Sequence, residues 1–408
     1  MTQSLFSRLF QAKAKASSPA LEGKNLGGFL AYSRVGQPVW TPRDYGALAR
    51  EGYARNAIAY RCVRMVAEAG ASVALAIEDG KGNPHAFADL LARPNPEQSG
   101  PELLEAFFGH LQIAGNGWLE LVALDGIPRE ICALRPDRVR IIPGKSGWPA
   151  GWEHDSNGIK RRLWRDEASG RAPVCHLKLF NPTDDLYGQS PLEAAAIAVD
   201  IHNAGGAWNK ALIDNAARPS GALVYRGGQG QERLSEDQFE RLKAELTQAH
   251  TGAANAGRPL LLEGGLEWTP MSLSPAEMDF VEARRAASRD IALAFGVPPM
   301  LLGIPGDNTY ANYREANLAF WRQTILPLVQ KAAATLGHWL APWSETGLKI
   351  SPRLDQIPAL AADQEANWAR IDATGFLTLN EKRVLAGLPP LQDPSAARFA
   401  TNQQGEGQ

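Results

Sequence analysis

Two helix starts that share one pattern constrain the fold more than any other feature of the chain. Ser190-Pro191-Leu192-Glu193 and Ser274-Pro275-Ala276-Glu277 each place proline after serine and glutamate at the fourth position. Serine is a favoured N-cap, proline fits the first helical position, and the glutamate closes a capping box. Helical patterning follows the first start to Ala217 and the second to Gly296. The sequence therefore predicts two long helices that bracket residues 219–273.

The bracketed segment has an apolar pattern of its own. Residues 222–225, 259–263 and 267–273 are strand-like, and a helix is expected to begin at Ser235. The pattern predicts a small module inserted between the two long helices. The apolar face of its helix, which is expected to form the core of the module, consists of Phe239, Leu242 and Leu246.

The part of the chain before the first long helix combines helices with hairpins. Helices are expected over residues 56–71 and 101–114, and residues 117–180 are rich in short β-prone runs. Asp125-Gly126 and Ser156-Asn157-Gly158 are turn signals between those runs. Strands joined by tight turns indicate an α+β domain and not a βαβ series.

The part after the second long helix begins with a loop. Pro298-Pro299 cannot continue a helix, and Pro305-Gly306 favours a turn. A further long helix is expected over residues 309–338, kinked by Pro327 because proline removes one backbone hydrogen bond. Two short helices are expected within residues 352–390.

Composition narrows the functional classes. The chain has 408 residues with 42 basic and 44 acidic side chains, a net charge of −2 that argues against a protein that grips nucleic acid. Its three cysteines lie far apart, so neither a zinc ribbon nor a disulfide scaffold is indicated. No apolar run is long enough for a membrane span, so no stable membrane insertion is expected.

The sequence contains no complete motif for a nucleotide site, a metal site or a catalytic nucleophile. Gly144-Lys145-Ser146 lacks the glycine that a P-loop requires at position 139, and Gly228-Gln229-Gly230 lacks the last glycine of a dinucleotide fingerprint. The seven histidines form no HExxH pair, and Ser190 is not in a GxSxG elbow. We therefore expect no cofactor, no metal site and no catalytic residue.

Three clusters leave alternatives open. Tryptophans and carboxylates between Trp148 and Glu167 could describe a glycan hydrolase site, or aromatic edges of a small sheet with solvated loops. Asp184-Asp185 could bind a cation or solvate a loop. A third cluster could contact phosphate, or simply suit the C-terminal half of its helix, where the macrodipole favours cations. Its members are Arg284, Arg285 and Arg289.

An ordered set of short peptides resembles the portal proteins of tailed phages, of the siphophage type. The peptides span about residues 45–390, and their order makes the resemblance specific although each alone is weak. Such proteins also occur in prophages and gene transfer agents. The peptides are Arg93-Pro94-Asn95-Pro96, Gly115-Asn116-Gly117, Leu134-Arg135-Pro136-Asp137-Arg138-Val139, Gly188-Gln189-Ser190-Pro191-Leu192, Gly257-Arg258-Pro259-Leu260, Leu262-Glu263-Gly264-Gly265, Phe295-Gly296-Val297-Pro298-Pro299, Thr309-Tyr310 with Asn312, and Thr378 with Asn380-Glu381.

The resemblance implies a portal fold with named parts. They are an N-terminal arm (1–40, expected to be flexible), an α+β wing (41–189), stem helices (190–218 and 274–297), a small α/β clip between them (219–273), a tunnel loop (298–310), a kinked wing helix (311–350), a short helical crown (351–393) and a tail expected to be disordered (394–408).

The resemblance also implies a function without catalysis. Twelve subunits would form a ring at one capsid vertex of the virion, assembled in the host cytoplasm, with double-stranded DNA passing through its channel. The implied partners are the large terminase, the major capsid protein and a head-to-tail adaptor. A minor capsid or adaptor protein without a channel is the alternative. The implied DNA-channel residues of the tunnel loop are Gly303, Ile304, Pro305, Gly306, Asp307, Asn308 and Thr309, and the stem residues that could face the channel are Arg284, Arg285 and Arg289.

Overall fold

The fold belongs to the compact unit that begins at Thr41. Within the chain, the computed structural model describes residues 40–145, 147–214, 221–225, 235–237, 240–241, 243–244, 266–270, 280–304, 310–388, 390–393 and 396. Among these residues, no helix is both long and apolar enough to cross a membrane.

Two helices form the centre of the core. Helix α2 (Ala57–Ser72) begins where the Asn56 side chain accepts hydrogen bonds from two backbone amides, and it packs against α4 (Gly100–Ala114). A capping box between Ser99 and Glu102 starts α4. Gly115, with φ of 71°, ends it in the left-handed conformation that glycine adopts freely. The side chains buried between and around these helices include Cys62, Val66, Phe107, Phe108 and Leu111.

Two antiparallel sheets of three strands follow α4 in the chain. One has the order β3-β2-β7 and the other β4-β5-β6. The hairpin predictions at Asp125-Gly126 and Asn157-Gly158 are confirmed, because all four residues have positive φ between paired strands. The β-prone runs of the sequence lie at 118–124, 139–143, 159–164 and 174–180, so β3, which carries Pro128, and β5, which is polar, were not predicted as runs. The bounds are β2 (Asn116–Leu124), β3 (Ile127–Leu134), β4 (Val139–Pro143), β5 (Pro149–Ser156), β6 (Ile159–Trp164) and β7 (Val174–Lys178).

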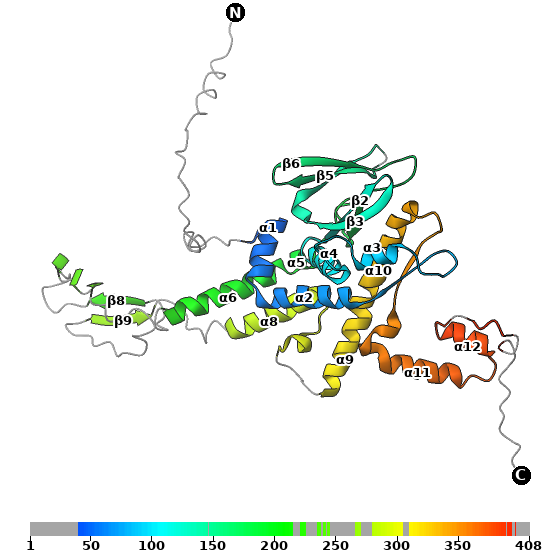
Figure 1. Cartoon of the computed structure of the whole chain (residues 1–408). Coiled ribbons are helices and arrows are strands. Elements are labelled where there is room, and N and C mark those ends of the chain that lie inside the picture. The colour runs from blue at the N-terminus through cyan, green and yellow to red at the C-terminus, as the bar shows by residue number, and fades with distance from the viewer. Residues whose placement is uncertain are drawn as a thin grey trace, which may run out of the picture. The chain divides into compact units, whose positions relative to one another are not determined.

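The first long helix is divided, which corrects the prediction of one continuous helix. It consists of α5 (Pro191–Ala194) and α6 (Ala196–Asp214), with Ala195 at φ −85° and ψ 0° between them. The two pieces differ in their main partner: α5 lies mainly against α4, and α6 lies mainly beside α8 (Phe280–Ala294). Leu192 is fully buried, so close to Gly52 that a Cβ added there would lie 2.8 Å from it. The interruption lets α5 follow the body while α6 leaves it with α8 (Figure 1).

Only one of the two hydrogen bonds of the predicted capping box is present at Ser190. Its hydroxyl accepts the Glu193 amide at 3.2 Å, but the Glu193 carboxylate lies 3.8 Å from Arg43. The Ser274 start lies outside the described residues. Gly205 and Gly206, within α6, are not required by a close backbone contact: among the described atoms, none lies within 4 Å of a Cβ added at either.

Only part of the bracketed module is described. Strands β8 (Gly221–Tyr225) and β9 (Leu266–Pro270) form an antiparallel pair, which confirms a strand at each end of the segment. Residues 236–237, 240–241 and 243–244 are helical. The predicted strand 259–263 and the predicted core residues Phe239, Leu242 and Leu246 lie outside the described residues.

The long helix near the C-terminus is confirmed, with a distortion where Pro327 was expected to cause one. Helices α9 (Tyr310–Phe320) and α10 (Leu326–Leu340) are joined by a π-helical turn, η6 (Trp321–Ile325). Leu326 donates to the Trp321 carbonyl, and Pro327 has no amide hydrogen with which to restore the α pattern.

The chain then returns to the body before its last helices. Strand β10 (Lys349–Pro352) pairs with β1 (Leu75–Glu78) and runs across the expected boundary at 350–351. The two short C-terminal helices are confirmed as α11 (Ala361–Asp372) and α12 (Leu379–Leu385). The remaining short elements are α1 (Tyr45–Ala47), η2 (Leu48–Ala54), α3 (Phe87–Ala92), η3 (Pro136–Arg138), η5 (Pro299–Leu302), η7 (Ala341–Trp343), η8 (Leu354–Gln356) and η9 (Pro358–Leu360).

Candidate functional site

The junction between the body and the helix pair is formed by a glycine contact. A Cβ added at Gly188 would lie 2.2 Å from the Gly115 carbonyl oxygen, and one at Gly115 would lie 2.5 Å from the Gln189 backbone. These distances are far below van der Waals contact, so the two loops can meet only without side chains. Ser190 is buried and donates to the Gln112 carbonyl at 3.0 Å. The junction therefore fixes where α5 begins relative to α4.

Asn116 joins both loops through its amide group. Its Oδ1 accepts from the Gly188 amide at 2.8 Å and lies 2.9 Å from His176 Nε2. Its Nδ2 donates to the carbonyls of Ala114 at 2.8 Å and Gly188 at 3.3 Å. Asn116 is buried and out of reach of water, so these protein partners take the place of the water that would otherwise bond its polar atoms.

His176 is a structural residue of strand β7. Its ring stacks on Trp118 with centroids 3.6 Å apart, and it lies beside Asn116. Burial, helped by the Lys178 charge, lowers the pKa of His176 to about 3. The histidine is therefore neutral at physiological pH, so its Nε2–H can donate to Asn116 Oδ1.

A second polar chain links α2 to both helices of the pair. Asn56 donates to Asn203 Oδ1 at 3.0 Å, and Asn203 donates to the Glu51 carbonyl at 2.8 Å. His202 Nδ1 lies 3.2 Å from Asn56 Nδ2, and Arg284 Nε donates to His202 Nε2 at 3.2 Å. Burial first, and the Arg284 charge second, lower the pKa of His202. The bonds of Asn203 therefore tie α6 to Asn56 and Glu51, and Arg284 ties α8 to α6.

The three arginines of α8 do not form one cluster of equivalent groups. Arg284 contacts His202, whereas Arg285 lies 3.3 Å from Glu282 on its own helix. Arg289 is exposed on the same helix. Of the predicted tunnel-loop residues, Gly303 ends η5 with φ of 71°, and Ile304 is buried. Residues 305–309, including Asp307, lie outside the described residues.

The tryptophan and carboxylate cluster is a solvated sheet surface. Trp152 is buried, while Trp148 is 76% exposed. Glu153 lies 3.4 Å from Lys160 and 3.5 Å from Arg162, contacts that lower its pKa. A catalytic acid needs a raised pKa, so the geometry contradicts the hydrolase hypothesis. The remaining cluster members are Trp164, which is exposed, Asp155, which caps its own turn, Asp166, which bonds Ser169, and Glu167, which is exposed.

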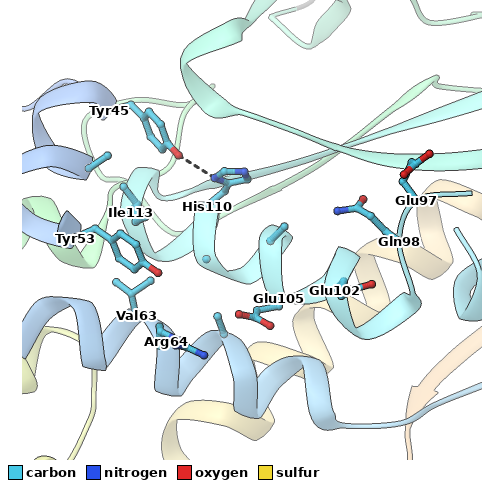
Figure 2. A pocket seen from close by; sticks show the side chains of 14 residues that line it. Tyr45, Tyr53, Val63, Arg64, Glu97, Gln98, Glu102, Glu105, His110 and Ile113 are labelled. Atoms are coloured by element: carbon cyan, nitrogen blue, oxygen red, sulfur yellow. Dashed lines mark hydrogen bonds between the residues drawn. The ribbon is translucent and has the colours of Figure 1, made fainter. Parts of the chain in front are cut away.

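An open groove lies between α2 and α4 (Figure 2). The Tyr45 hydroxyl lies 3.0 Å from His110 Nδ1. Burial raises the pKa of Tyr45 and lowers that of His110 to about 4, so both are neutral near pH 7. Glu97, Glu102 and Glu105 line the other end. Among the described residues, no group of three or more ionisable side chains is arranged to hold a metal ion.

Asp184 and Asp185 also serve their loop. The Asp184 carboxylate accepts from the amides of Leu186 at 2.7 Å and Tyr187 at 3.0 Å. The Lys178 ammonium donates to the Asp185 carbonyl. The solvated-loop interpretation explains these contacts without a cation.

Residues 57–387 match the family model described as phage portal protein. The chain belongs to the phage portal protein family. The portal family is structural, so this chain is a component of a phage or gene transfer agent particle at its head-to-tail connection, and it is not an enzyme. The resemblance inferred from the ordered peptides is thereby confirmed.

Solved structures and a curated relative agree with the family. The chain is 52% identical to one titled "Neck of empty GTA particle computed with C6 symmetry", covering 87% of this chain and 96% of that one with a TM-score of 0.68. It is equally identical to one titled "Neck of native GTA particle computed with C12 symmetry", with a TM-score of 0.66 and the same coverage. The probable portal protein of Streptomyces phage phiC31 is 23% identical over 94% of this chain and 86% of that protein.

Sequence reasoning missed the structural roles of Asn116 and Asp200. Asn116 stood in a quoted peptide, but its bonds to Gly188 and His176 were not foreseen. An asparagine between two glycines directly after a helix was the available signal. Asp200 was also missed: its carboxylate accepts from the Thr41 amide at 2.9 Å and from the Thr41 hydroxyl, which holds the start of the body against α6.

Proposed function

We propose that this portal protein forms a closed ring of twelve subunits through which double-stranded DNA enters and leaves the particle. The observation that carries the proposal is the 52% identity, over almost all of the chain, to a neck with twelve-fold symmetry. A net charge of −2 supports it, because many phosphate contacts would bind DNA tightly and slow its passage.

The helix pair and its module supply the stem and clip of that ring. Helices α6 and α8 lie side by side. In the chain, β8 follows α6 and β9 precedes α8. The module at 219–273 is then the docking site for the large terminase and later for a tail adaptor, while residues 41–189 form a wing that contacts the major capsid protein. Assembly in the host cytoplasm is part of the same proposal.

The channel surface is assigned to α8 and the loop after it. The exposed charged residues of α8 are three arginines and two acids, so repulsion offsets most of the attraction of phosphate; they are Arg284, Arg285 and Arg289 with Glu282 and Asp290. The loop at 303–309 adds one charge per copy, Asp307, which a ring repeats at one level of the channel. Repulsion there would keep DNA from sticking.

Imaging with native mass measurement tests the ring. Twelve copies of the 44.1 kDa chain have a mass of about 530 kDa, and closure follows when each copy contacts its neighbour through two different faces. Closed rings with that mass are expected from purified protein. A stable species of 44.1 kDa at micromolar concentration, without rings in the images, would contradict the proposal and favour a minor capsid or adaptor protein.

Asp307→Lys tests the channel. The substitution replaces a ring of negative charges with positive ones, so DNA packaging should slow or stall, and added salt should relieve the defect. Rings should still assemble. Packaging assays at low and high salt provide the measurement, and wild-type yield at both would refute the role of the loop.

A further inference from the structure

The groove between α2 and α4 has a volume of about 560 Å³ and contains a stretch of small residues that we call its floor. Ala67 contributes to the floor from α2, and Ala106 and Gly109 contribute from α4. Among the described atoms, none lies within 4 Å of a Cβ added at Gly109, so the space above this residue is open. Residues this small let the backbone of a second segment approach closely. The floor therefore has room for apolar side chains from outside.

The two ends of the groove differ in charge (Figure 2). At one end the Tyr45 hydroxyl lies 3.0 Å from His110 Nδ1, and burial keeps both side chains neutral near pH 7. At the other end are three carboxylates, those of Glu97, Glu102 and Glu105. The groove therefore combines a neutral end that forms hydrogen bonds, an apolar floor and an acidic end.

Two of the three carboxylates lack a counterion within the described part of the chain. There, no hydrogen bond or ion pair reaches the carboxylate of Glu97 or of Glu105, whereas the capping box of α4 holds Glu102. Arg64 also lines the groove, but its guanidinium is already paired with Glu68. Negative charges without a counterion repel one another, and a cation placed between them removes that repulsion. The acidic end is therefore complementary to a positive group.

Other classes of ligand fit this groove poorly. Carboxylates repel the phosphates of DNA. The described residues contain no group of three or more ionisable side chains that could hold a metal ion. Small molecules usually bind in concave pockets that bury most of their surface, whereas this groove is open. A protein segment with both positive and apolar side chains matches all three parts of the groove.

We propose that the groove between α2 and α4 binds a basic, partly apolar segment of a second protein. Apolar side chains of that segment lie on the floor at Ala67 and Gly109, and its lysine or arginine pairs with Glu97 and Glu105. Burial of apolar surface supplies affinity, while charge complementarity selects the partner and speeds its approach. The inference goes beyond the proposed ring and channel, because neither of them requires this groove.

Selection from a library of short random peptides, with the full chain as target, tests the proposal. The selected peptides should be enriched in lysine or arginine together with apolar residues. They should bind the double variant Glu97→Lys and Glu105→Lys about tenfold more weakly or worse, since repulsion replaces attraction, and added salt should weaken the wild-type complex. Glu167→Lys is the matched control: Glu167 is exposed and lies outside the groove, so this variant should bind the peptides as the wild type does.

A steric variant separates the groove from the rest of the acidic surface. Gly109→Leu places a branched side chain on the floor, where a Cβ meets no described atom, so the protein should fold and bind the peptides about tenfold more weakly. Gly109→Ala fills much less of the groove and should retain binding. Circular dichroism spectra of both variants show whether the fold is intact, and the lysine variants keep the test decisive if Gly109→Leu does not fold.

Four results would overturn the proposal. The first is selection of peptides without basic residues, and the second is equal affinity of the wild type and the double lysine variant. The third is binding that begins only after residues 1–40 are removed, which would assign the groove to this chain's own terminal segment. The fourth is binding to the single chain that is lost in rings, which would assign it to a neighbouring copy.

Discussion

The glycine junction and the outer sheet β4-β5-β6 play roles opposite to those that their residue types suggest. The outer sheet holds tryptophans and carboxylates, the residue types of many active sites, yet Trp148 is 76% exposed and Glu153 faces lysine and arginine. The junction holds glycine, asparagine and serine, yet Asn116 and Ser190 are buried with partners for their polar atoms. In this portal protein, the glycine, asparagine and serine residues of the junction determine the architecture.

The difference follows from what burial does to a polar group. An exposed carboxylate that loses its ion pair regains water, so the pair adds little to stability. A buried amide that loses a partner regains nothing, and the cost is the full desolvation of the group left behind. Substitutions should therefore have large effects at the junction and small ones on the outer sheet.

The largest effect is expected for Gly188→Ala. The new Cβ would lie 2.2 Å from the Gly115 carbonyl, so the backbone must move, at about 3 kcal/mol or more of unfolding free energy. Chemical denaturation measures the change. Gly109→Ala on α4 is the control: nothing lies within 4 Å of the new methyl group, and alanine favours helix by about 0.5–1 kcal/mol. Equal stability of the two variants would refute the close-contact argument.

Asn116→Ala should be the next most damaging change. It leaves the Gly188 amide and the Ala114 carbonyl without their partner, and we expect a loss of about 2–3 kcal/mol in unfolding free energy. Asn367→Ala, at a surface position of α11 that contacts Arg370, should change it by less than about 0.5 kcal/mol. The junction would lose its assigned role if both variants unfolded at the same denaturant concentration.

Acidification should weaken the body of the protein through its buried histidines. Burial lowers the pKa of His110 to about 4 and of His176 to about 3, below the usual value in an unfolded chain. The unfolded chain therefore binds more protons than the folded chain does. The free energy of unfolding falls as pH drops below about 6.5, by up to about 1.4 kcal/mol per pH unit for each histidine.

The double variant His110→Gln and His176→Gln tests this pH dependence. Its unfolding free energy, measured between pH 7 and pH 5, should fall less steeply than that of the wild type. This window lies above the titration of ordinary carboxylates. An unchanged slope would show that other groups cause the acid sensitivity.

The smallest effect is expected for Glu153→Gln on the outer sheet. The Glu153 side chain is half-buried, but its partners Lys160 and Arg162 are exposed and stay hydrated without it, and glutamine keeps its size, so the melting temperature should change little. A thermal melt provides the measurement. A decrease comparable to that of Asn116→Ala would remove the contrast between the two regions.

The sequence predicted features that depend on a few neighbouring residues. The cap at Ser190, the turn at Asp125-Gly126 and the distortion near Pro327 each follow from local chemistry, and each is present. Antiparallel hairpins, and with them the α+β class, followed from the same turn signals. The candidate residues of the tunnel loop and clip stay predictions, apart from the placement of Gly303 and Ile304.

The tertiary structure decided what depends on residues distant in the chain. The sequence by itself placed the start of the first long helix and the ordered peptides of the family. It could not show that α5 and α6 separate at Ala195, that β10 pairs with β1, or that Arg284 contacts His202. Caps, turns and prolines act through the backbone within a few residues. Contacts such as Gly115 against Gly188 exist only once packing has brought two surfaces together, because nothing in either peptide specifies its partner.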